Sequence, residues 1–491
     1  MRRGCVGVLV ALAVGVRAGG CEHTTGLLLP ARESDTLDLP APVLVARLMH
    51  VSDLHLMDTL SPARFAQAHA FSATAWRPYE AYSTQLADGI LRATNRIHAA
   101  GRTIDFVMLT GDVCDNAQAN ELAWLRALFD GGVVNPLSGP DDRAPADRPA
   151  VELDPYAAFE AQGLYRAGVH GALPSIPWYT LIGNHDALAL GVFPFFEAAA
   201  GHRTAPLPLE WRPGIVLPVL LDPTGAWAYG NVTPAEPGPP GWFEVAQPVV
   251  PDPARAYFSK PEFVQALFTT ATEPAGHGFA GVDAGATWYS VSPVAGLRLI
   301  GLDTTDAVRK LPGHMYDNGA LSRAQFAFLQ AELAAAIRRG ELVIVATHHP
   351  SDTLTTLAGT EVGADEFRAA LQACPAVVLH LAGHMHRNRV VDRVTYVEIE
   401  TCATLDPPQE ARLVELWRDT TGGQIAVVYE MFSHIQDELP PLGDDPLRAL
   451  RAQALARGDK LAAARQRQHD PSGADPRGTP ADRAGVLILP R

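Results

Sequence analysis

Five apolar runs in this sequence stop abruptly at aspartate, asparagine or histidine. The junctions are Met49–Ser52 before Asp53-Leu54-His55, Val107–Thr110 before Gly111-Asp112-Val113-Cys114-Asp115, Tyr179–Ile182 before Gly183-Asn184-His185-Asp186, Val343–Ala346 before Thr347-His348-His349, and Val378–Leu381 before Ala382-Gly383-His384-Met385-His386. Continuous apolar runs are typical of strands that are covered on both faces. Because the carboxyl ends of such strands meet at one edge of a sheet, we expect these polar side chains to gather in one place.

Apolar runs and helical patterns alternate along most of the chain. The predicted strands are 45–52, 104–109, 178–182, 297–302, 342–346, 377–381, 394–399 and 425–429, and the predicted helices are 82–99, 119–129, 322–336 and 364–372. This alternation predicts a layered α/β fold.

Two stretches interrupt the alternation, at about 131–175 and 187–290. The second has 12 prolines between Pro206 and Pro253, too many for a regular helix or a central strand. We expect both stretches to be insertions over the core, forming either irregular surface loops or a lid that shapes the substrate site.

The composition fits a folded protein without a nucleic-acid partner. Of the 491 residues, 47% are hydrophobic and 19% are charged, which argues against wholesale disorder. The net charge of −15 works against binding of phosphate backbones, which depends on clustered Lys and Arg. Five cysteines are too few for a disulfide-built scaffold, although Cys374 and Cys402 could pair in an oxidising compartment.

The first residues have the pattern of an export signal. Arg2 and Arg3 precede an apolar run, Val6–Val16, that is too short to span a bilayer. Ala18-Gly19-Gly20 then leads into Cys21, which resembles a bacterial lipobox. We expect residues 1–20 to be a signal peptide and Cys21 to be lipidated, giving a periplasmic or cell-envelope lipoprotein; plain secretion and no export remain alternatives. Residues 21–45 suit a tether.

The end of the chain, 436–491, is charged and rich in Ala and Arg. We predict a surface tail with one helix over 446–468 and disorder in the last 20 residues.

The side chains at the five strand ends have the chemistry of metal ligands. Imidazole and carboxylate suit Zn, Mn, Fe or Ni, and no thiolate belongs to the set. Gly111, Gly183 and Gly383 allow tight turns in which the backbone approaches a metal or substrate closely. A single Asp-x-His or His-x-His would be weak evidence, but five such motifs in this order are specific.

Together the motifs resemble the calcineurin-like metallophosphoesterase superfamily, whose pattern is Asp-x-His, Gly-Asp-x-x-Asp, Gly-Asn-His-Asp/Glu, His and Gly-His-x-His. The resemblance covers about residues 47–402. It implies a four-layer αββα sandwich of two mixed β-sheets flanked by helices, here one catalytic domain over 46–435 with insertions.

The resemblance also implies a site with two divalent cations, Mn, Fe or Zn. The first cation would be held by Asp53, His55, Asp112 and His386, and the second by Asp112, Asn184, His348 and His384. His185 would lie over the substrate phosphate and stabilise charge or protonate the leaving oxygen. Asp115 would be the acidic partner that orients His185 and raises its proton affinity.

Residues at two positions argue against two branches of the superfamily. Asp115 stands where purple acid phosphatases have an iron-binding Tyr, and Asn116 stands where Ser/Thr protein phosphatases have a phosphate-binding Arg. The Gly-Asp-x-x-Asp motif at Gly111–Asp115 is more similar to that of the cyclic-nucleotide phosphodiesterase-like members. We therefore expect a hydrolase of a small phosphoester, either a phosphodiesterase or a phosphomonoesterase. The alternatives are a nuclease of the same superfamily and a non-catalytic binding protein with a vestigial site. The oligomeric state stays open.

Overall fold

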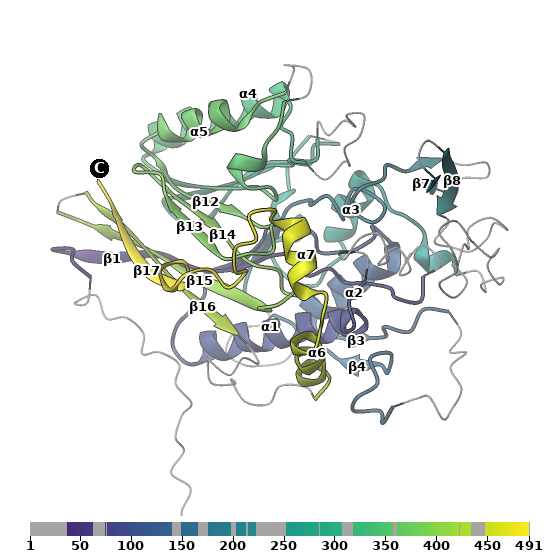
Figure 1. The fold of residues 1–491 in the computed structure, drawn as a ribbon. Helices are drawn as coiled ribbons and strands as arrows, with labels where there is room; N and C mark the ends of the chain where they lie inside the picture. Colours follow the sequence, from purple (N-terminus) through teal and green to yellow (C-terminus); the bar gives the residue numbers. More distant parts are fainter. Residues whose placement is uncertain are drawn as a thin grey trace, which may run out of the picture.

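The computed structural model describes most of the chain, namely residues 37–61, 74, 76–139, 149–164, 175–197, 203–212, 215–221, 252–283, 285–306, 318–356, 361–421, 423–433 and 447–490. Within these ranges, two six-stranded sheets stack face to face with helices outside them (Figure 1). The predicted αββα sandwich is confirmed. None of the helices in the described ranges has the length and apolar character needed to cross a bilayer.

The first sheet contains the strands that precede three of the motifs. Its order is β17-β16-β15-β1-β2-β5, with β1 parallel to β2 and β2 parallel to β5. The bounds are β1 Pro42–Val51, β2 Phe106–Leu109, β5 Trp178–Thr180, β15 Glu410–Asp419, β16 Ile425–Ser433 and β17 Ala484–Leu489. Since β1, β2 and β5 run in one direction, the first three motifs emerge at the same sheet edge.

The second sheet contains the strands that precede the other two motifs. Its order is β13-β14-β12-β11-β10-β9, and β10, β11, β12 and β14 are parallel. The bounds are β9 Tyr289–Val294, β10 Leu297–Gly301, β11 Leu342–Ala346, β12 Val377–Ala382, β13 Arg389–Asp392 and β14 Val397–Glu400. The His348 and His384-x-His386 motifs follow the neighbouring strands β11 and β12.

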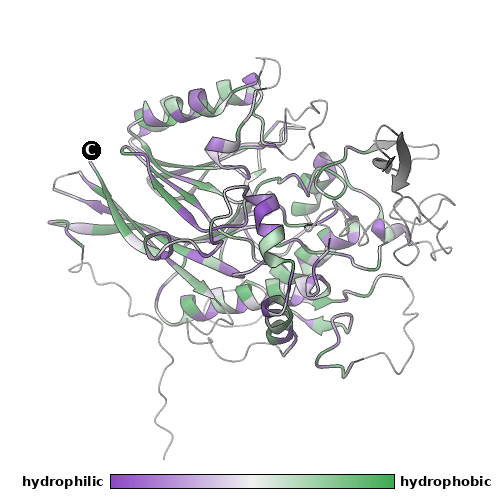
Figure 2. Ribbon diagram, viewed as in Figure 1, coloured by the Kyte–Doolittle hydropathy of each residue, from purple (hydrophilic) through white to green (hydrophobic). Residues whose placement is uncertain are grey.

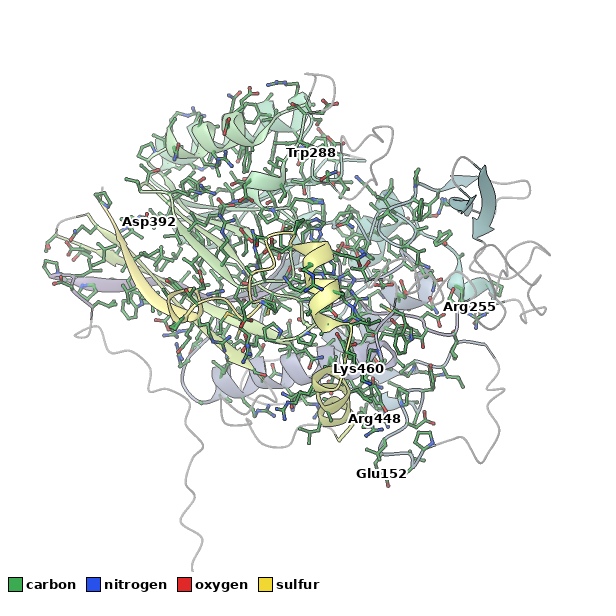
Figure 3. All side chains as sticks on the ribbon, viewed as in Figure 1. Glu152, Arg255, Trp288, Asp392, Arg448 and Lys460 are labelled. Atoms are coloured by element: carbon green, nitrogen blue, oxygen red, sulfur yellow. The ribbon has the colours of Figure 1, made fainter. Side chains whose placement is uncertain are left out.

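The side chains of strand β11 pack alternately in two hydrophobic cores. Ile344 and Ala346 belong to the core between the two sheets, whereas Val343 and Val345 pack in a second core beneath the outer helices. Side chains alternate between the faces of a strand, so a strand covered on both sides must be apolar throughout. Figure 2 shows the hydrophobic colour along the strands of both sheets, and Figure 3 shows side chains filling the space between the layers.

Helices cover the two outer faces. Near the second sheet lie α4 and α5, and near the first lie α1 and α2 (Figure 1). The bounds are α1 Ser83–Ala99, α2 Ala119–Asp130, α3 Lys260–Leu267, α4 Arg323–Arg339, α5 Ala364–Gln372, α6 Leu447–Arg457, α7 Ala462–His469 and α8 Pro480–Arg483. Ser322 caps α4 by accepting a hydrogen bond from the backbone N–H of Gln325.

The insertions contain more regular structure than the prolines suggested. Within the first, β3 Val133–Val134 pairs with β4 Phe159–Glu160. Within the second, a separate three-stranded sheet consists of β6 Phe196–Glu197, β7 Arg203–Arg212 and β8 Ile215–Leu221. The prolines are accommodated because this small sheet is not part of the central layers, where a missing N–H would break a ladder.

The expectation of a loose C-terminal tail is wrong for the described residues. The single helix predicted over 446–468 is two helices, α6 and α7, and α6 packs on α1. Instead of being disordered, Ala484–Leu489 forms β17, which pairs antiparallel with β16. The predicted tether over 21–45 is wrong at its end, because β1 begins at Pro42 and Leu37 and Leu39 are buried against Trp417. The rest of the division into signal, tether and catalytic domain remains a prediction, since residues 1–36 lie outside the described ranges.

Candidate metal centre

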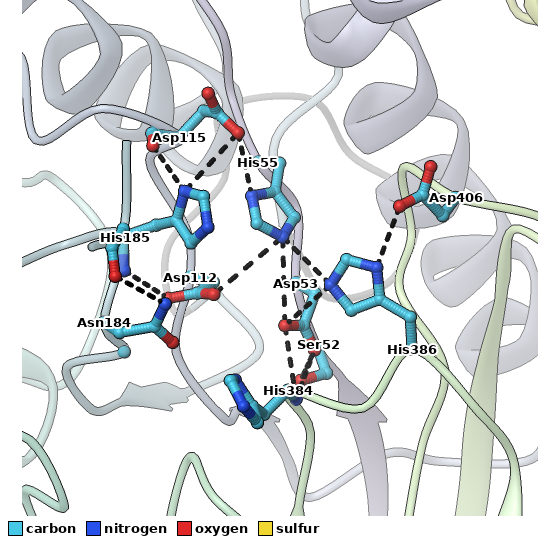
Figure 4. A network of polar contacts seen from close by, with 12 residues as sticks. Ser52, Asp53, His55, Asp112, Asp115, Asn184, His185, His384, His386 and Asp406 are labelled. Carbon is cyan, nitrogen blue, oxygen red and sulfur yellow. Dashed lines mark hydrogen bonds and ion pairs between the residues drawn. The ribbon is translucent and has the colours of Figure 1, made fainter. Parts of the chain in front are cut away.

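The five strand-end motifs converge between the carboxyl ends of the two sheets. The first sheet supplies the motifs after β1, β2 and β5, and the second supplies those after β11 and β12. Figure 4 shows Asp53, Asp112, Asn184 and His386 close together. All seven side chains expected to bind metal lie in this cluster: Asp53, His55, Asp112, Asn184, His348, His384 and His386. Six of the seven are buried, and His384 is partly exposed.

One half of the cluster is formed by Asp53, His55 and His386. The Nε2 atoms of the two histidines are 3.1 Å apart, and Asp53 Oδ1 lies 3.4 Å from His386 Nε2 and 3.9 Å from His55 Nε2. Asp112 Oδ2 lies 3.8 Å from His55 Nε2, on the side facing the other half. These atoms form the set predicted for the first cation.

The other half contains His348, Asn184 and His384. His348 Nε2 lies 3.2 Å from Asp112 Oδ2 and 2.9 Å from Asn184 Oδ1. The His384 ring lies 5.2 Å from the His348 ring, centroid to centroid. Asp112 therefore contacts both halves, as a bridging carboxylate would. Asn184 Nδ2 donates to the Gly191 carbonyl, so its neutral oxygen faces the cluster.

The outward hydrogen bonds of three histidines fix which nitrogen faces the cluster. Nδ1 of His55 donates to Asp115 Oδ1, Nδ1 of His348 to the Thr110 carbonyl, and Nδ1 of His386 to Asp406 Oδ2. Each Nε2 is left facing the carboxylates. A ligating histidine is commonly held this way by a carboxylate or carbonyl. Two Nε2 lone pairs at 3.1 Å repel unless a proton or a cation lies between them. The donor set fits a pair of divalent cations.

The pKa values of the groups in the cluster are shifted in opposite directions. Burial lowers the pKa of His55, and burial together with His348 holds the pKa of His384 well below its usual value. Although burial raises it, the neighbouring histidines bring the pKa of Asp112 down to about 2. Burial opposes ionisation of His386, but Asp406 and Asp53 raise its pKa to about 9. Although burial lowers it, Asp112 likewise raises the pKa of His348 to about 9, so His348 and His386 carry protons near neutral pH. Ionised carboxylates and neutral imidazoles are the forms that bind metal, so a bound cation would displace these two protons.

The backbone at the cluster is strained. Among the described residues, ten non-glycine residues have a positive φ, and five of these are expected ligands: Asp53, His55, Asp112, His384 and His386. Such conformations are unfavourable for these side chains and concentrate at functional sites. The motif glycines allow the close packing that the sequence predicted. A Cβ at Gly183 would collide with the Asp112 carboxylate, and one at Gly383 with Ser52 Oγ.

His185 lies beside the cluster and is more exposed than the buried ligands. Its side chain is 19% exposed, and its backbone N–H donates to Asp112 Oδ1 at 2.8 Å. The ring Nδ1 donates to the backbone carbonyl of Asp115 at 2.6 Å, whereas the Asp115 carboxylate is 3.6 Å away. That carboxylate instead makes its hydrogen bond with His55, at 3.1 Å. The predicted pairing of His185 with Asp115 is therefore made mainly through the backbone.

Three residues to which the sequence assigned no role support the cluster. Asp406 accepts from His386 and also from Arg77 and Tyr79. Although burial raises it, the charges of Arg77 and Arg465 and the hydrogen bond from His386 hold the pKa of Asp406 well below the usual range. Asp186 accepts from the backbone N–H of Val113, Cys114 and Gly183 and so ties two motif loops together. His469 stacks on His386 from α7. Asp406 lies in the segment after β14, so its position after a sixth predicted strand was the only indication of its role in the sequence.

The three cysteines in the described ranges have no part in the cluster. Cys114, Cys374 and Cys402 are buried and unbonded to one another, so the considered disulfide between Cys374 and Cys402 is not formed. Cys21, the predicted lipidation site, lies outside the described residues.

Comparisons with known proteins agree with the motifs. Residues 46–227 match the family model of the calcineurin-like phosphoesterases, whereas no curated protein gives a significant sequence match. A dimetal phosphatase from Danio rerio is similar at 12% identity and a TM-score of 0.40, over 80% of this chain and 98% of its own. A candidate 5'-nucleotidase from Staphylococcus aureus, in complex with alpha-ketoglutarate, is similar at 14% identity and a TM-score of 0.34, over 83% of this chain and 58% of its own. Residues 46–227, which contain the first three of the five strand-end motifs, are thus similar to the calcineurin-like phosphoesterases.

Proposed function

We propose that this phosphoesterase hydrolyses a small phosphoester with the help of two divalent cations, Mn, Fe or Zn. The observation that carries the proposal is the position of Asp112, whose Oδ2 lies 3.8 Å from His55 Nε2 and 3.2 Å from His348 Nε2. One carboxylate thus contacts both sets of ligand atoms, and each set contains residues from both sheets. When bound, two cations would polarise the phosphoryl group and lower the pKa of water held between them.

The protein's own groups would orient the reacting atoms. With Nδ1 of His185 held by the Asp115 carbonyl, only Nε2 is left to meet a substrate oxygen. We assign His185 to stabilising charge on the phosphoryl group or protonating the leaving oxygen. Asp115 acts as a positioning residue, through its carbonyl for His185 and through its carboxylate for His55. Asn184 supplies an oxygen without adding negative charge.

The substrate class is tested by a paired assay with p-nitrophenyl phosphate and its bis ester, using protein purified without chelator. We expect turnover of at least one of the two compounds, and about two transition-metal ions per chain by elemental analysis. Preference for one compound identifies a monoesterase or a diesterase. Turnover by protein shown to be free of metal would contradict the proposal, and hydrolysis of single-stranded DNA alone would favour the nuclease alternative.

Two variants separate the proposed roles. Asp112→Asn removes the shared carboxylate charge, and we expect it to lose metal and nearly all turnover. His185→Ala removes no ligand, and we expect it to keep metal while turnover falls by roughly 100- to 10,000-fold, the range typical of a lost general acid or base. Unchanged turnover in His185→Ala would show that its assigned role is wrong.

We further propose that the protein acts in the bacterial cell envelope as a lipoprotein anchored at Cys21. The support is the sequence alone: two arginines, the apolar run Val6–Val16, and small residues before the cysteine. In a bacterial host, Cys21→Ala should release the protein from the membrane fraction. Equal membrane association of both forms would count against the anchor.

A further inference from the structure

The loop that carries His384 and His386 is fastened to the C-terminal segment 466–482. Three residues of the loop, which continues into β13, make contacts at 2.7–2.8 Å with this segment. The contacts are Arg387 Nη1 with Asp470 Oδ2, the Asn388 N–H with the Pro476 carbonyl, and the Val390 N–H with Asp482 Oδ1. Two of these contacts are donated by backbone N–H groups, so the segment fixes the path of the loop and not only its side chains.

His469, which belongs to the C-terminal segment, contacts the expected metal ligand His386 directly. Its ring lies 3.9 Å from the His386 ring, centroid to centroid, with 28° between the planes. The side chain is 16% exposed, and its Nε2 lies 3.8 Å from Asp406 Oδ2. Nε2 of His469 makes no hydrogen bond within the described ranges. The interaction with His386 is therefore a contact between ring faces and not a hydrogen bond.

A third cation between His386, Asp406 and His469 is a weaker reading of the same group. The three side chains lie close enough to hold an ion. Nδ1 of His386, however, already donates to Asp406 at 2.8 Å, and both Arg77 and Tyr79 also donate to this carboxylate. A cation there would have to break the bond that turns His386 Nε2 toward Asp53. The geometry favours a supporting role for His469.

We propose that His469 is a positioning residue for His386, held in place by the C-terminal segment. Its ring covers one face of the His386 imidazole, limits rotation of that imidazole, and keeps water from the bond between His386 and Asp406. This inference rests on the proposed two-cation function and extends it to a part of the chain that lies far beyond the residues matched by the family model. The C-terminal segment is thus part of the metal centre.

Cobalt binding tests the inference without using catalysis. Metal-free full-length protein is titrated with Co²⁺, following heat and the visible ligand-field bands of the bound ion. We expect His469→Ala to weaken one of the two sites by about 10- to 100-fold, as loss of a group that supports a ligand does, and to change its bands. His469→Phe keeps the stacked ring and should restore both properties. Arg467→Ala removes an exposed side chain of the same helix and should behave as wild type.

Each outcome is informative. Wild-type affinity and bands in His469→Ala would overturn the inference, and so would a His469→Phe protein as impaired as His469→Ala. If His469→Ala fails to fold by circular dichroism, Asp470→Asn, which weakens the ion pair with Arg387, should reduce affinity at the same site; no reduction would overturn the role of the segment. Absence of Co²⁺ binding by the wild type would instead contradict the proposed function.

Discussion

At the scale of single residues, the turns that carry the expected ligands depend on contacts between segments far apart in the chain. The Asp-x-His and Gly-His-x-His motifs correctly located side chains that meet in space. The left-handed φ of Asp53, Asp112 and His386 could not be predicted, because these residue types usually avoid it. Those conformations exist because tertiary contacts, such as the hydrogen bond from the Asp53 N–H to the Gly111 carbonyl, hold the turns in place.

The partners that orient the ligands were also difficult to predict. His348 uses a backbone carbonyl, that of Thr110, which carries no sequence signature. Asp406 is 20 residues beyond His386 and outside any motif. Its carboxylate accepts a hydrogen bond from Arg77, which is 329 residues away in the sequence. Local patterns reveal ligands that share a turn, but they do not reveal supporting groups that only the fold brings close.

Gly191 limits where the His185 ring can lie, and we predict that Gly191→Ala impairs turnover. A Cβ at Gly191, whose φ is 70°, would collide with Cδ2 and Nε2 of His185. Displacing the ring by about 1 Å should reduce kcat by on the order of 100-fold. Steady-state kinetics with p-nitrophenyl phosphate, together with metal analysis, measure the effect.

Gly281→Ala is the matched control. Gly281 has a similar φ of 78°, but no atom lies within 4 Å of the added Cβ. It should carry the same backbone cost and leave kcat unchanged. Equal kcat in the two variants would show that the position of the His185 ring does not matter.

At the scale of elements, strands that are buried on both faces and wholly apolar were easy to predict. Strands that contain buried charged residues were hard to predict. Strand β11 was predicted with its bounds because every residue from Leu342 to Ala346 is apolar. Strand β15 was missed because it contains Arg412 and Glu415, which look like surface residues but are buried. Glu415 accepts from Arg47 and from Trp417, and a buried charge of this kind requires such partners.

The C-terminal strand is the element for which structure and sequence disagree most, and a truncation discriminates between them. A chain ending at Arg483 lacks β17, which removes the pairing along β16 and the buried side chain of Leu489. Loss of a buried leucine alone costs about 2–5 kcal/mol, so thermal unfolding should occur at a clearly lower temperature. The uncovered edge of β16 should also promote aggregation.

A chain ending at Leu489 provides the control, since it lacks two residues and keeps the strand. It should unfold at the wild-type temperature. Hydrogen exchange should be faster along Ile425–Glu430 in the shorter chain only. Identical unfolding of both truncated chains would support the loose tail that the composition suggested.

At the scale of the whole molecule, the site lies where two sheets meet. Asp53, His55 and Asp112 follow strands of one sheet, while His348 and His386 follow strands of the other. The strand pattern predicted that such ends converge within a sheet, but the stacking of one sheet edge against the other came only from the family resemblance. Cations bound here would connect the two sheets in addition to the shared apolar core.

We therefore predict that metal binding stabilises the whole fold. A ligand that binds only the folded protein adds about 2.7 kcal/mol per site when its concentration is 100 times its Kd. The unfolding temperature of chelator-treated protein should rise with added Mn²⁺ and continue to rise with its concentration. Ca²⁺ should have little effect, because it prefers oxygen ligands and this cluster offers four imidazoles, those of His55, His348, His384 and His386. Asp112→Asn should lose most of the response to Mn²⁺, and an unfolding temperature of the wild type that is independent of Mn²⁺ would contradict a metal centre that joins the sheets.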